Sequence, residues 1–184
     1  MREVIILGRG GQGAQTAGNQ LARAFFDEGL FVQTFATYGG ARRGTPVAAS
    51  IRADARPIRL RADITAADAL LCFDDSLLND AFLARGAADA LVVVNSARPA
   101  TALPRRPGQR LIAIDGRAIA RRNRMGKVVN SALLGAFVAG LGAPSLATMC
   151  RVIRAMAPAK PDENVAACRE AHGEVADATL EVLP

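Results

Sequence analysis

A glycine-rich loop between an apolar strand and a small-residue helix is the feature that most constrains the fold. Residues Glu3–Leu7 are mostly apolar, as in a strand buried on both faces, and Gly8-Arg9-Gly10-Gly11-Gln12-Gly13 follows directly. From Ala14 to Phe25, small and apolar residues recur at helical spacing, and Gly29 is expected to end this helix. A second strand over Leu30–Phe35 completes a strand–helix–strand unit, which predicts a parallel sheet.

The remaining chain alternates strands with connections and then becomes helical. Strands are predicted over Pro46–Ala53, Ala69–Phe73, Ala90–Val94 and Leu111–Ile114, a helix over Ser76–Arg85, and connections over Ala36–Thr45 and Arg98–Arg110. Later helices are expected from Asn130 as an N-cap, from near Ser145, and from about Asp162 towards Glu181. The pattern predicts one α/β domain over residues 1–184: a doubly wound, mostly parallel, Rossmann-like sheet flanked by helices, with a helical C-terminal third.

Composition limits the partners that the chain can have. The net charge is +6, but the basic residues are almost all arginines spread along the chain, and aromatic residues make up only 4%. Base-stacking platforms are therefore scarce, and no nucleic-acid partner is expected. The arginine-rich composition itself, or a positive face for an acidic partner or an anionic ligand, accounts for the charge. The one local concentration of arginines is at Arg117, Arg121, Arg122 and Arg124.

Neither a metal nor a membrane is indicated. The three cysteines, Cys72, Cys150 and Cys168, are far apart and form no C-x-x-C pair, so no iron–sulfur cluster or zinc site is expected on this chain. Each lies in an apolar stretch and is expected to be a buried hydrophobic residue. No apolar run reaches the ~20 residues of a membrane span, and the start of the chain is a poor signal peptide, which favours a cytoplasmic protein.

The glycine loop also permits a dinucleotide site. Gly8, Gly10 and Gly13 fit the G-x-G-x-x-G pattern, in which backbone N–H groups approach an anion at a helix N-terminus. However, residues 33–36 contain no carboxylate for an adenosine ribose, and Arg42 and Arg43 come several residues late for a 2′-phosphate. A free-standing NAD(P)-binding protein therefore remains an alternative, as does a structural or regulatory interaction module.

Three segments together resemble the gamma subunit of pyruvate:ferredoxin oxidoreductase and its 2-oxoacid oxidoreductase relatives. They are the loop at 8–13, the segment Tyr38-Gly39-Gly40-Ala41-Arg42-Arg43-Gly44-Thr45-Pro46-Val47, and Asn130-Ser131-Ala132-Leu133-Leu134-Gly135-Ala136-Phe137. The resemblance covers nearly the whole chain, and the second segment is its most distinctive part. Tyr38, Gly40 and Ser131 depart from the residues that are common in this family.

The resemblance implies a complex that converts a 2-oxoacid and coenzyme A to acyl-CoA, CO2 and a reduced acceptor. The 2-oxoacid would be pyruvate or another, such as the aryl oxoacid phenylglyoxylate, and the acceptor ferredoxin or, through an additional flavin subunit carrying FAD, NAD. Thiamine diphosphate and iron–sulfur clusters would be held by alpha, beta and ferredoxin-like (delta) subunits. The gamma-type chain would hold no cofactor, contribute no catalytic residue, and lie on the coenzyme A side of the active site.

Residues of these segments are the candidates for contact with coenzyme A or with a partner subunit. They are Gly8, Arg9, Gly10, Gly11, Gln12, Gly13, Tyr38, Gly39, Arg42, Arg43 and Asn130. Arginine suits bidentate recognition of phosphate, but Arg42 and Arg43 could equally form ion pairs within the chain. Asn130 could serve only as a helix cap. Asp74 and Asp75 either face a ligand or cap the helix expected at Ser76, and the cap is favoured.

Overall fold

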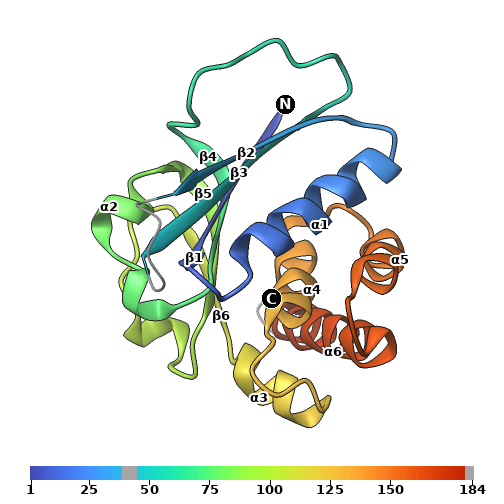
Figure 1. Cartoon of the computed structure of the whole chain (residues 1–184). Helices are drawn as coiled ribbons and strands as arrows, with labels where there is room; N and C mark the ends of the chain where they lie inside the picture. Colours follow the sequence, from blue (N-terminus) through green and yellow to red (C-terminus); the bar gives the residue numbers. More distant parts are fainter. Residues whose placement is uncertain (39–44, 181–184) are drawn as a thin grey trace.

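A six-stranded sheet forms the centre of the computed structural model, which describes residues 1–38 and 45–180 (Figure 1). The strand order is β2-β3-β1-β4-β5-β6. The strands are β1 (Arg2–Arg9), β2 (Phe31–Tyr38), β3 (Pro46–Asp54), β4 (Ala67–Cys72), β5 (Gly86–Asn95) and β6 (Arg110–Ile114). Each predicted strand is present, and β2 continues to Tyr38, where a connection had been expected from Ala36 onwards.

The sheet is mostly parallel, as expected, but β3 runs the other way. β1, β4, β5 and β6 pair in parallel, whereas β3 is antiparallel to both β1 and β2. β2 and β3 pair along their length, with Tyr38 opposite Val47 and Phe31 opposite Asp54. This hairpin-like pairing places β3 between β1 and β2, so the direct parallel pair expected from the first strand–helix–strand unit is absent among the described residues.

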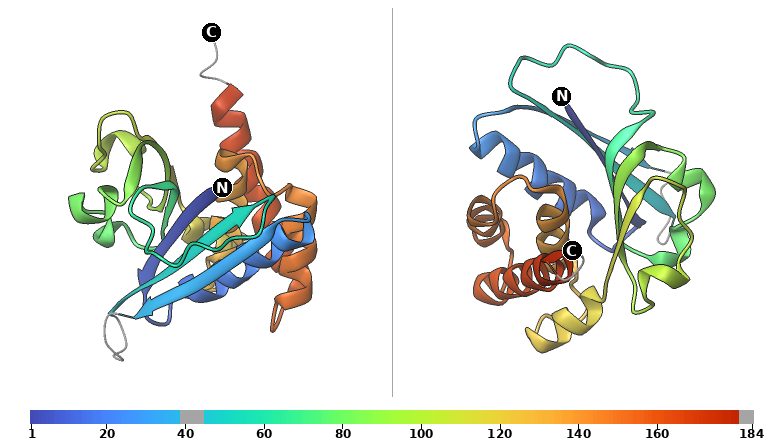
Figure 2. Two further views of the ribbon diagram at one scale, coloured as in Figure 1. Left: turned by 90° about the horizontal axis from the view of Figure 1, so that it is seen from above. Right: turned by 180° about the vertical axis from the view of Figure 1, so that it is seen from behind.

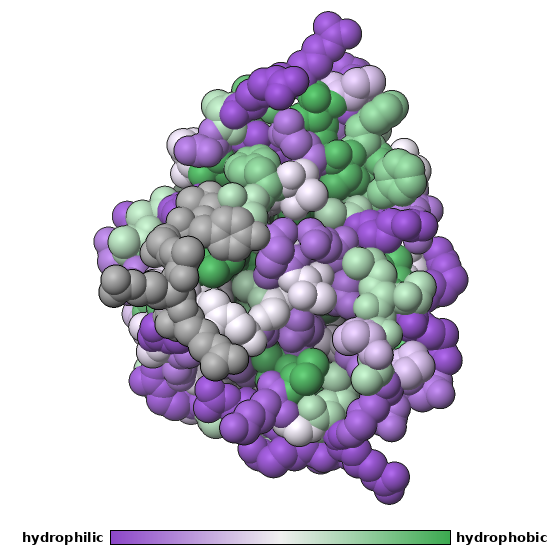
Figure 3. Space-filling model, in the orientation of Figure 1, coloured by the Kyte–Doolittle hydropathy of each residue, from purple (hydrophilic) through white to green (hydrophobic). Residues whose placement is uncertain are grey.

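The longer helices lie on one face of the sheet (Figures 1 and 2). They are α1 (Ala14–Asp27), α4 (Asn130–Leu141), α5 (Leu146–Met156) and α6 (Pro161–Leu180). Their apolar side chains join the strands in a large core, and α4 is buried between the sheet and α6. Polar and smaller apolar areas alternate on the surface seen in Figure 3. None of the helices in the described part of the chain is long and apolar enough to cross a membrane.

The opposite face carries only short elements. In place of the helix predicted over Ser76–Arg85, a 3-10 turn (Asp75–Leu77) precedes the four-residue helix α2 (Asp80–Leu83). The reason is Asn79, whose extended backbone separates the two and whose side chain accepts a 2.9 Å hydrogen bond from the Phe82 N–H, so a new helix starts there. A second 3-10 turn, Ala100–Ala102, lies within the predicted 98–110 connection.

A buried arginine anchors the antiparallel part of the sheet, and the sequence pattern did not reveal it. The Arg52 side chain is 1% exposed and its Nε donates a hydrogen bond to Glu3 Oε1 at 2.6 Å. Its Nη2 donates to the Ala62 carbonyl oxygen at 2.7 Å, and its guanidinium carbon lies 5.5 Å from the Phe35 ring centroid. Arg52 thus connects β3, β1 and β2 with the 55–66 segment, with its buried charge paired.

Candidate functional site

The carboxyl ends of the parallel strands meet at one edge of the sheet, where a pocket opens. From β1 the chain continues through α1 to one side of the sheet, and β4 begins its other side, so this edge is a topological switch point. The pocket has a volume of about 720 Å³. Its described lining is Gly11, Gln12, Gly13, Phe73, Asn95, Arg117, Arg121, Gly126, Lys127, Val128, Val129 and Asn130.

The glycine loop forms one wall of this pocket. Gly11 and Gly13 have φ values of +93° and +88°, in the left-handed region that favours glycine. Gly13 is the N-cap residue of α1, and no side chain caps this helix. The N–H groups of the first turn of α1, which form the positive end of the helix dipole, therefore lie at the pocket wall. The Gly10 N–H is bonded to the Thr45 carbonyl oxygen at 2.9 Å, which joins the loop to the start of β3.

A network of side chains fixes the loop to the end of β4. Arg9 Nε and Gln12 Nε2 both donate to Asp74 Oδ2, at 3.2 and 3.0 Å, and Gln12 Oε1 accepts from the Arg9 N–H at 2.7 Å. Asp74 also accepts from the Ser76 N–H, so the favoured capping role is present, but the same carboxylate holds the loop. Burial opposes ionisation of Asp74, but the hydrogen bonds from Ser76, Gln12 and Arg9 outweigh it and lower its pKa to about 2.

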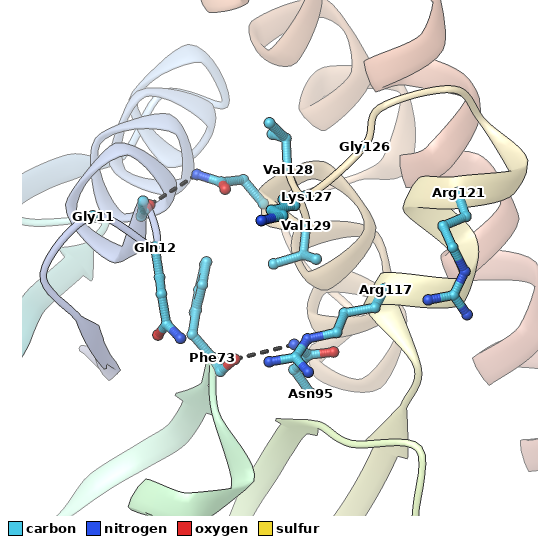
Figure 4. A pocket seen from close by; sticks show the side chains of 12 residues that line it. Gly11, Gln12, Phe73, Asn95, Arg117, Arg121, Gly126, Lys127, Val128 and Val129 are labelled. Carbon is cyan, nitrogen blue, oxygen red and sulfur yellow. Dashed lines mark hydrogen bonds between the residues drawn. The ribbon is translucent and has the colours of Figure 1, made fainter. Parts of the chain in front are cut away.

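Asn130, at the start of α4, also bonds to the glycine loop. The structure corrects its expected role: Asn130 is the first residue of α4, the N-cap is Val129, and no side chain caps this helix. Its Nδ2 instead donates a 2.8 Å hydrogen bond to the Gly13 carbonyl oxygen. The first and third resemblance segments, 117 residues apart, are therefore in contact (Figure 4).

Cationic side chains supply the wall opposite the loop. Arg117 and Arg121 are one turn apart on α3 (Gly116–Arg122), a helix absent from the sequence-based prediction, and Lys127 lies in the segment that follows. All three are exposed. Figure 4 shows Arg117 extending towards Phe73 and Asn95. The described lining includes no carboxylate, so the pocket is electropositive.

Asn95 holds this wall in place. Its side chain is buried at the end of β5, where Nδ2 donates to the Phe73 carbonyl oxygen at 3.1 Å. Its Oδ1 accepts from the Gly116 N–H at 3.0 Å, which fixes the start of α3. A smaller pocket of about 340 Å³, which includes Asp74 and Asp75, shares Asn95, Arg117 and Arg121 with the first.

The sequence alone indicates the arginines near 117–124 only as a local concentration of positive charge. The available signal was Asp115-Gly116 after a strand, because Asp115 Oδ1 accepts from the Ala118 N–H and caps α3. Arg122 points elsewhere and forms ion pairs with Glu170 and Glu174 of α6.

The second resemblance segment reaches the same edge of the sheet. Tyr38 ends β2 opposite Val47, and Val47 lies opposite Gly8 at the end of β1. Gly39, Arg42 and Arg43 lie outside the described residues. Within residues 1–38 and 45–180, no group of three or more His, Cys, Asp or Glu side chains could hold a metal ion.

Comparisons with known proteins agree on one family. Residues 3–174 match the family described as pyruvate ferredoxin/flavodoxin oxidoreductase. The chain is 35% identical over 156 residues to pyruvate synthase subunit PorC of Methanosarcina barkeri, covering 84% of this chain and 86% of the relative. It is 36% identical over 177 residues to the pyruvate/ketoisovalerate oxidoreductases common subunit gamma of Thermococcus kodakarensis, covering 93% and 95%.

One solved structure is similar to this chain over most of the length of both. The crystal structure of pyruvate oxidoreductase subunit PORC from Thermotoga maritima has a TM-score of 0.82 and 27% sequence identity, with coverage of 94% of this chain and 95% of that one.

Proposed function

The chain belongs to the pyruvate ferredoxin/flavodoxin oxidoreductase family, as a gamma-type subunit, and we propose that its pocket binds the phosphate-bearing part of coenzyme A for the assembled enzyme. The complex would convert a 2-oxoacid and coenzyme A to acyl-CoA and CO2 and pass electrons to ferredoxin. Pyruvate is the proposed substrate, with an aryl oxoacid such as phenylglyoxylate as a second candidate. Alpha, beta and delta subunits would supply the catalytic residues, thiamine diphosphate and iron–sulfur clusters.

The charge of the pocket carries this proposal. Arg117, Arg121 and Lys127 face a glycine loop at the N-terminus of α1, and the described lining has no acidic side chain. Coenzyme A bears a pyrophosphate and a 3′-phosphate, which match guanidinium donors and backbone N–H groups. The volume of about 720 Å³ is that of a small-molecule site.

An NAD(P) site is supported by the glycine loop but less so by the sheet. In dinucleotide-binding folds, the residue that holds the adenosine ribose follows the strand beside β1. Here the strand beside β1 on that side is β3, which is antiparallel and begins rather than ends at the pocket edge. The geometry therefore favours coenzyme A over NAD(P).

Purification of the native complex under anaerobic conditions tests the subunit assignment, with intact-complex mass and iron–sulfur absorbance as readouts. Calorimetric titrations of that complex with coenzyme A, 3′-dephospho-coenzyme A and pantetheine then test the ligand. We expect affinity to decrease in that order, because phosphates are removed stepwise. Equal affinity for all three would reject the phosphate role, and a lone chain that binds NAD(P) would reject the proposal as a whole.

A further inference from the structure

The edge of the sheet opposite the pocket carries an exposed arm. β3 ends at this edge with Asp54 and β4 begins there with Ala67, so the connection between them lies on the far side of the sheet from the glycine loop. Figures 1 and 2 show this connection arching away from the body of the molecule. Its residues 55–63, here called the arm, contain no helix or strand, and all of them except Ile58 are exposed.

Both ends of the arm are held by the sheet. At its start, the Arg56 N–H donates a hydrogen bond to Asp54 Oδ1 at 3.0 Å. At its end, the Ala62 carbonyl oxygen accepts from the buried Arg52 Nη2 at 2.7 Å. Directly after the arm, Ile64 is 2% exposed and belongs to the smaller core cluster. The arm is therefore shaped before a partner binds, which lowers the entropic cost of binding.

The arm presents positive charge that the chain does not use. The side chains of Arg59 and Arg61 are exposed and form no hydrogen bond or ion pair with the residues that the structure describes. By contrast, Arg52 below the arm is paired with Glu3. The sequence from 55 to 62 contains no acidic residue. Guanidinium groups in this state are available to carboxylates of another molecule.

Large exposed apolar side chains gather at the same edge. Of the six in the described part of the chain, four lie on the arm, before β1, or where α1 turns into β2: Leu60, Met1, Phe26 and Phe31. Leu60 is 44% exposed, and Phe31 is 49% exposed and pairs with Asp54, the residue before the arm. Figure 3 shows hydrophobic areas beside hydrophilic ones at this end, which is uppermost in the view. Single exposed apolar residues are common, but apolar groups flanked by arginines are typical of protein interfaces.

We propose that the arm docks on an acidic surface of another subunit of the oxidoreductase, where Leu60 enters an apolar hollow and Arg59 and Arg61 pair with surrounding carboxylates. The inference rests on the assignment as a gamma-type subunit but not on coenzyme A binding, because the arm and the pocket lie at opposite edges of the sheet. A second copy of this chain fits less well, because two arms in contact would bring their arginines together.

Reconstitution of the complex with variant chains tests the arm, with native mass spectrometry as the measure of assembly. Leu60→Asp should weaken assembly on the order of tenfold or more, as for the loss of an interface hot spot. The double variant Arg59→Glu, Arg61→Glu should weaken it roughly as much, because like charges then face each other. The matched controls, Met156→Asp and the double variant Arg105→Glu, Arg106→Glu, change exposed residues outside the arm and should assemble as the parent does.

Hydrogen–deuterium exchange of the unmodified chain locates the contact. Amides of residues 55–63 should exchange on the order of tenfold more slowly in the complex than in the free chain. Circular dichroism checks that each variant is folded, and if one is not, this exchange measurement decides alone.

Three outcomes are informative. Equal exchange of residues 55–63 in both states, or arm variants that assemble as the parent does, would overturn the proposal. A free chain that dimerises and that Leu60→Asp converts to a monomer would identify a second copy as the occupant, which also overturns it. A parent chain that joins no complex would instead reject the subunit assignment on which the inference rests.

Discussion

The Asn130 side-chain amide donates a 2.8 Å hydrogen bond to the Gly13 carbonyl oxygen, across 117 residues of chain. Gly13 is the N-cap residue of α1, and Asn130 is the first residue of α4. This one bond therefore fixes the relative position of two helices at the pocket and makes two distant sequence motifs parts of one wall.

Replacement of Gly13 by alanine should destabilise the chain more than replacement of Gly11. Both residues have positive φ, so each substitution is expected to cost roughly 1–2 kcal/mol. Only at Gly13 would the added Cβ come within 3.0 Å of the Asn130 side chain, whereas at Gly11 nothing lies within 4 Å. Displacement of the Asn130 bond should add about 1 kcal/mol. Urea unfolding of Gly13→Ala and Gly11→Ala measures the difference, and equal losses would show that the Asn130 contact contributes nothing.

Removal of the α3 arginines should weaken coenzyme A binding to the assembled complex. Arg117→Ala and Arg121→Ala are each expected to lower affinity roughly tenfold, as for the loss of one charge-assisted contact to phosphate. Arg105→Ala, an exposed arginine outside this pocket, is the matched control. Isothermal titration with coenzyme A measures all three.

The same titration tests the sequence-based candidates Arg42 and Arg43. If Arg42→Ala and Arg43→Ala weaken binding while the α3 variants do not, the phosphate contacts belong to the 39–44 segment instead of α3. Unchanged affinity in all four variants would remove the ligand role from both sets.

Replacement of Asp74 should change the dependence of stability on pH. The pKa of Asp74 in the folded chain is about 2, below its ordinary value of 3.8, so its ionised form stabilises the fold. That contribution, about 2 kcal/mol, is complete above pH 4–5 and is lost as pH falls through 3.8 towards 2. Asp74→Asn should therefore be less stable than the parent at pH 7, and the gap should narrow at pH 2–3. Denaturant unfolding at several pH values measures it, with the exposed Asp177→Asn as control.

Two helical glycines should respond oppositely to alanine. At Gly135 of α4, an added Cβ would come closer than 3.0 Å to the backbone of Cys168 in α6, which cannot move aside without separating the helices. At Gly173 of α6, nothing lies within 4 Å, and alanine is the better helix former. Gly135→Ala should destabilise by roughly 2 kcal/mol or more, as expected for overpacking, and Gly173→Ala should stabilise by up to about 1 kcal/mol. Thermal unfolding compares them, and a neutral Gly135→Ala would indicate looser packing of α4 on α6.

Features encoded by neighbouring residues were predictable from the sequence. The helix after the glycine loop ends at Asp27, two residues before Gly29. α5 begins next to Ser145, as expected, and Ser145 caps it through a 3.2 Å bond from the Thr148 N–H. Both depend on local periodicity and capping preferences. The sequence also predicted which edge of the sheet would hold a binding site, because the carboxyl ends of parallel strands lie together.

Features that depend on distant partners were not predictable. Asn130 has the residue type of a cap, but α4 begins at Asn130 itself with Val129 as the N-cap, and the Asn130 amide bonds to Gly13, 117 residues earlier. Arg52 lies in a strand where its burial depends on Glu3 and the Ala62 carbonyl. β2 and β3 are consecutive strands, but the pairing of β3 with β1, which inserts β3 between β1 and β2, is long-range and has no local signature.

That insertion affects the order in which the chain can fold during synthesis. β1, α1 and β2 emerge first, but β2 occupies the sheet edge and pairs, within the described residues, only with β3. A nascent chain that ends before Pro46 therefore has two strands without the one that joins them. The amino-terminal unit should remain open to proteases until β3 has left the ribosome and fills the gap.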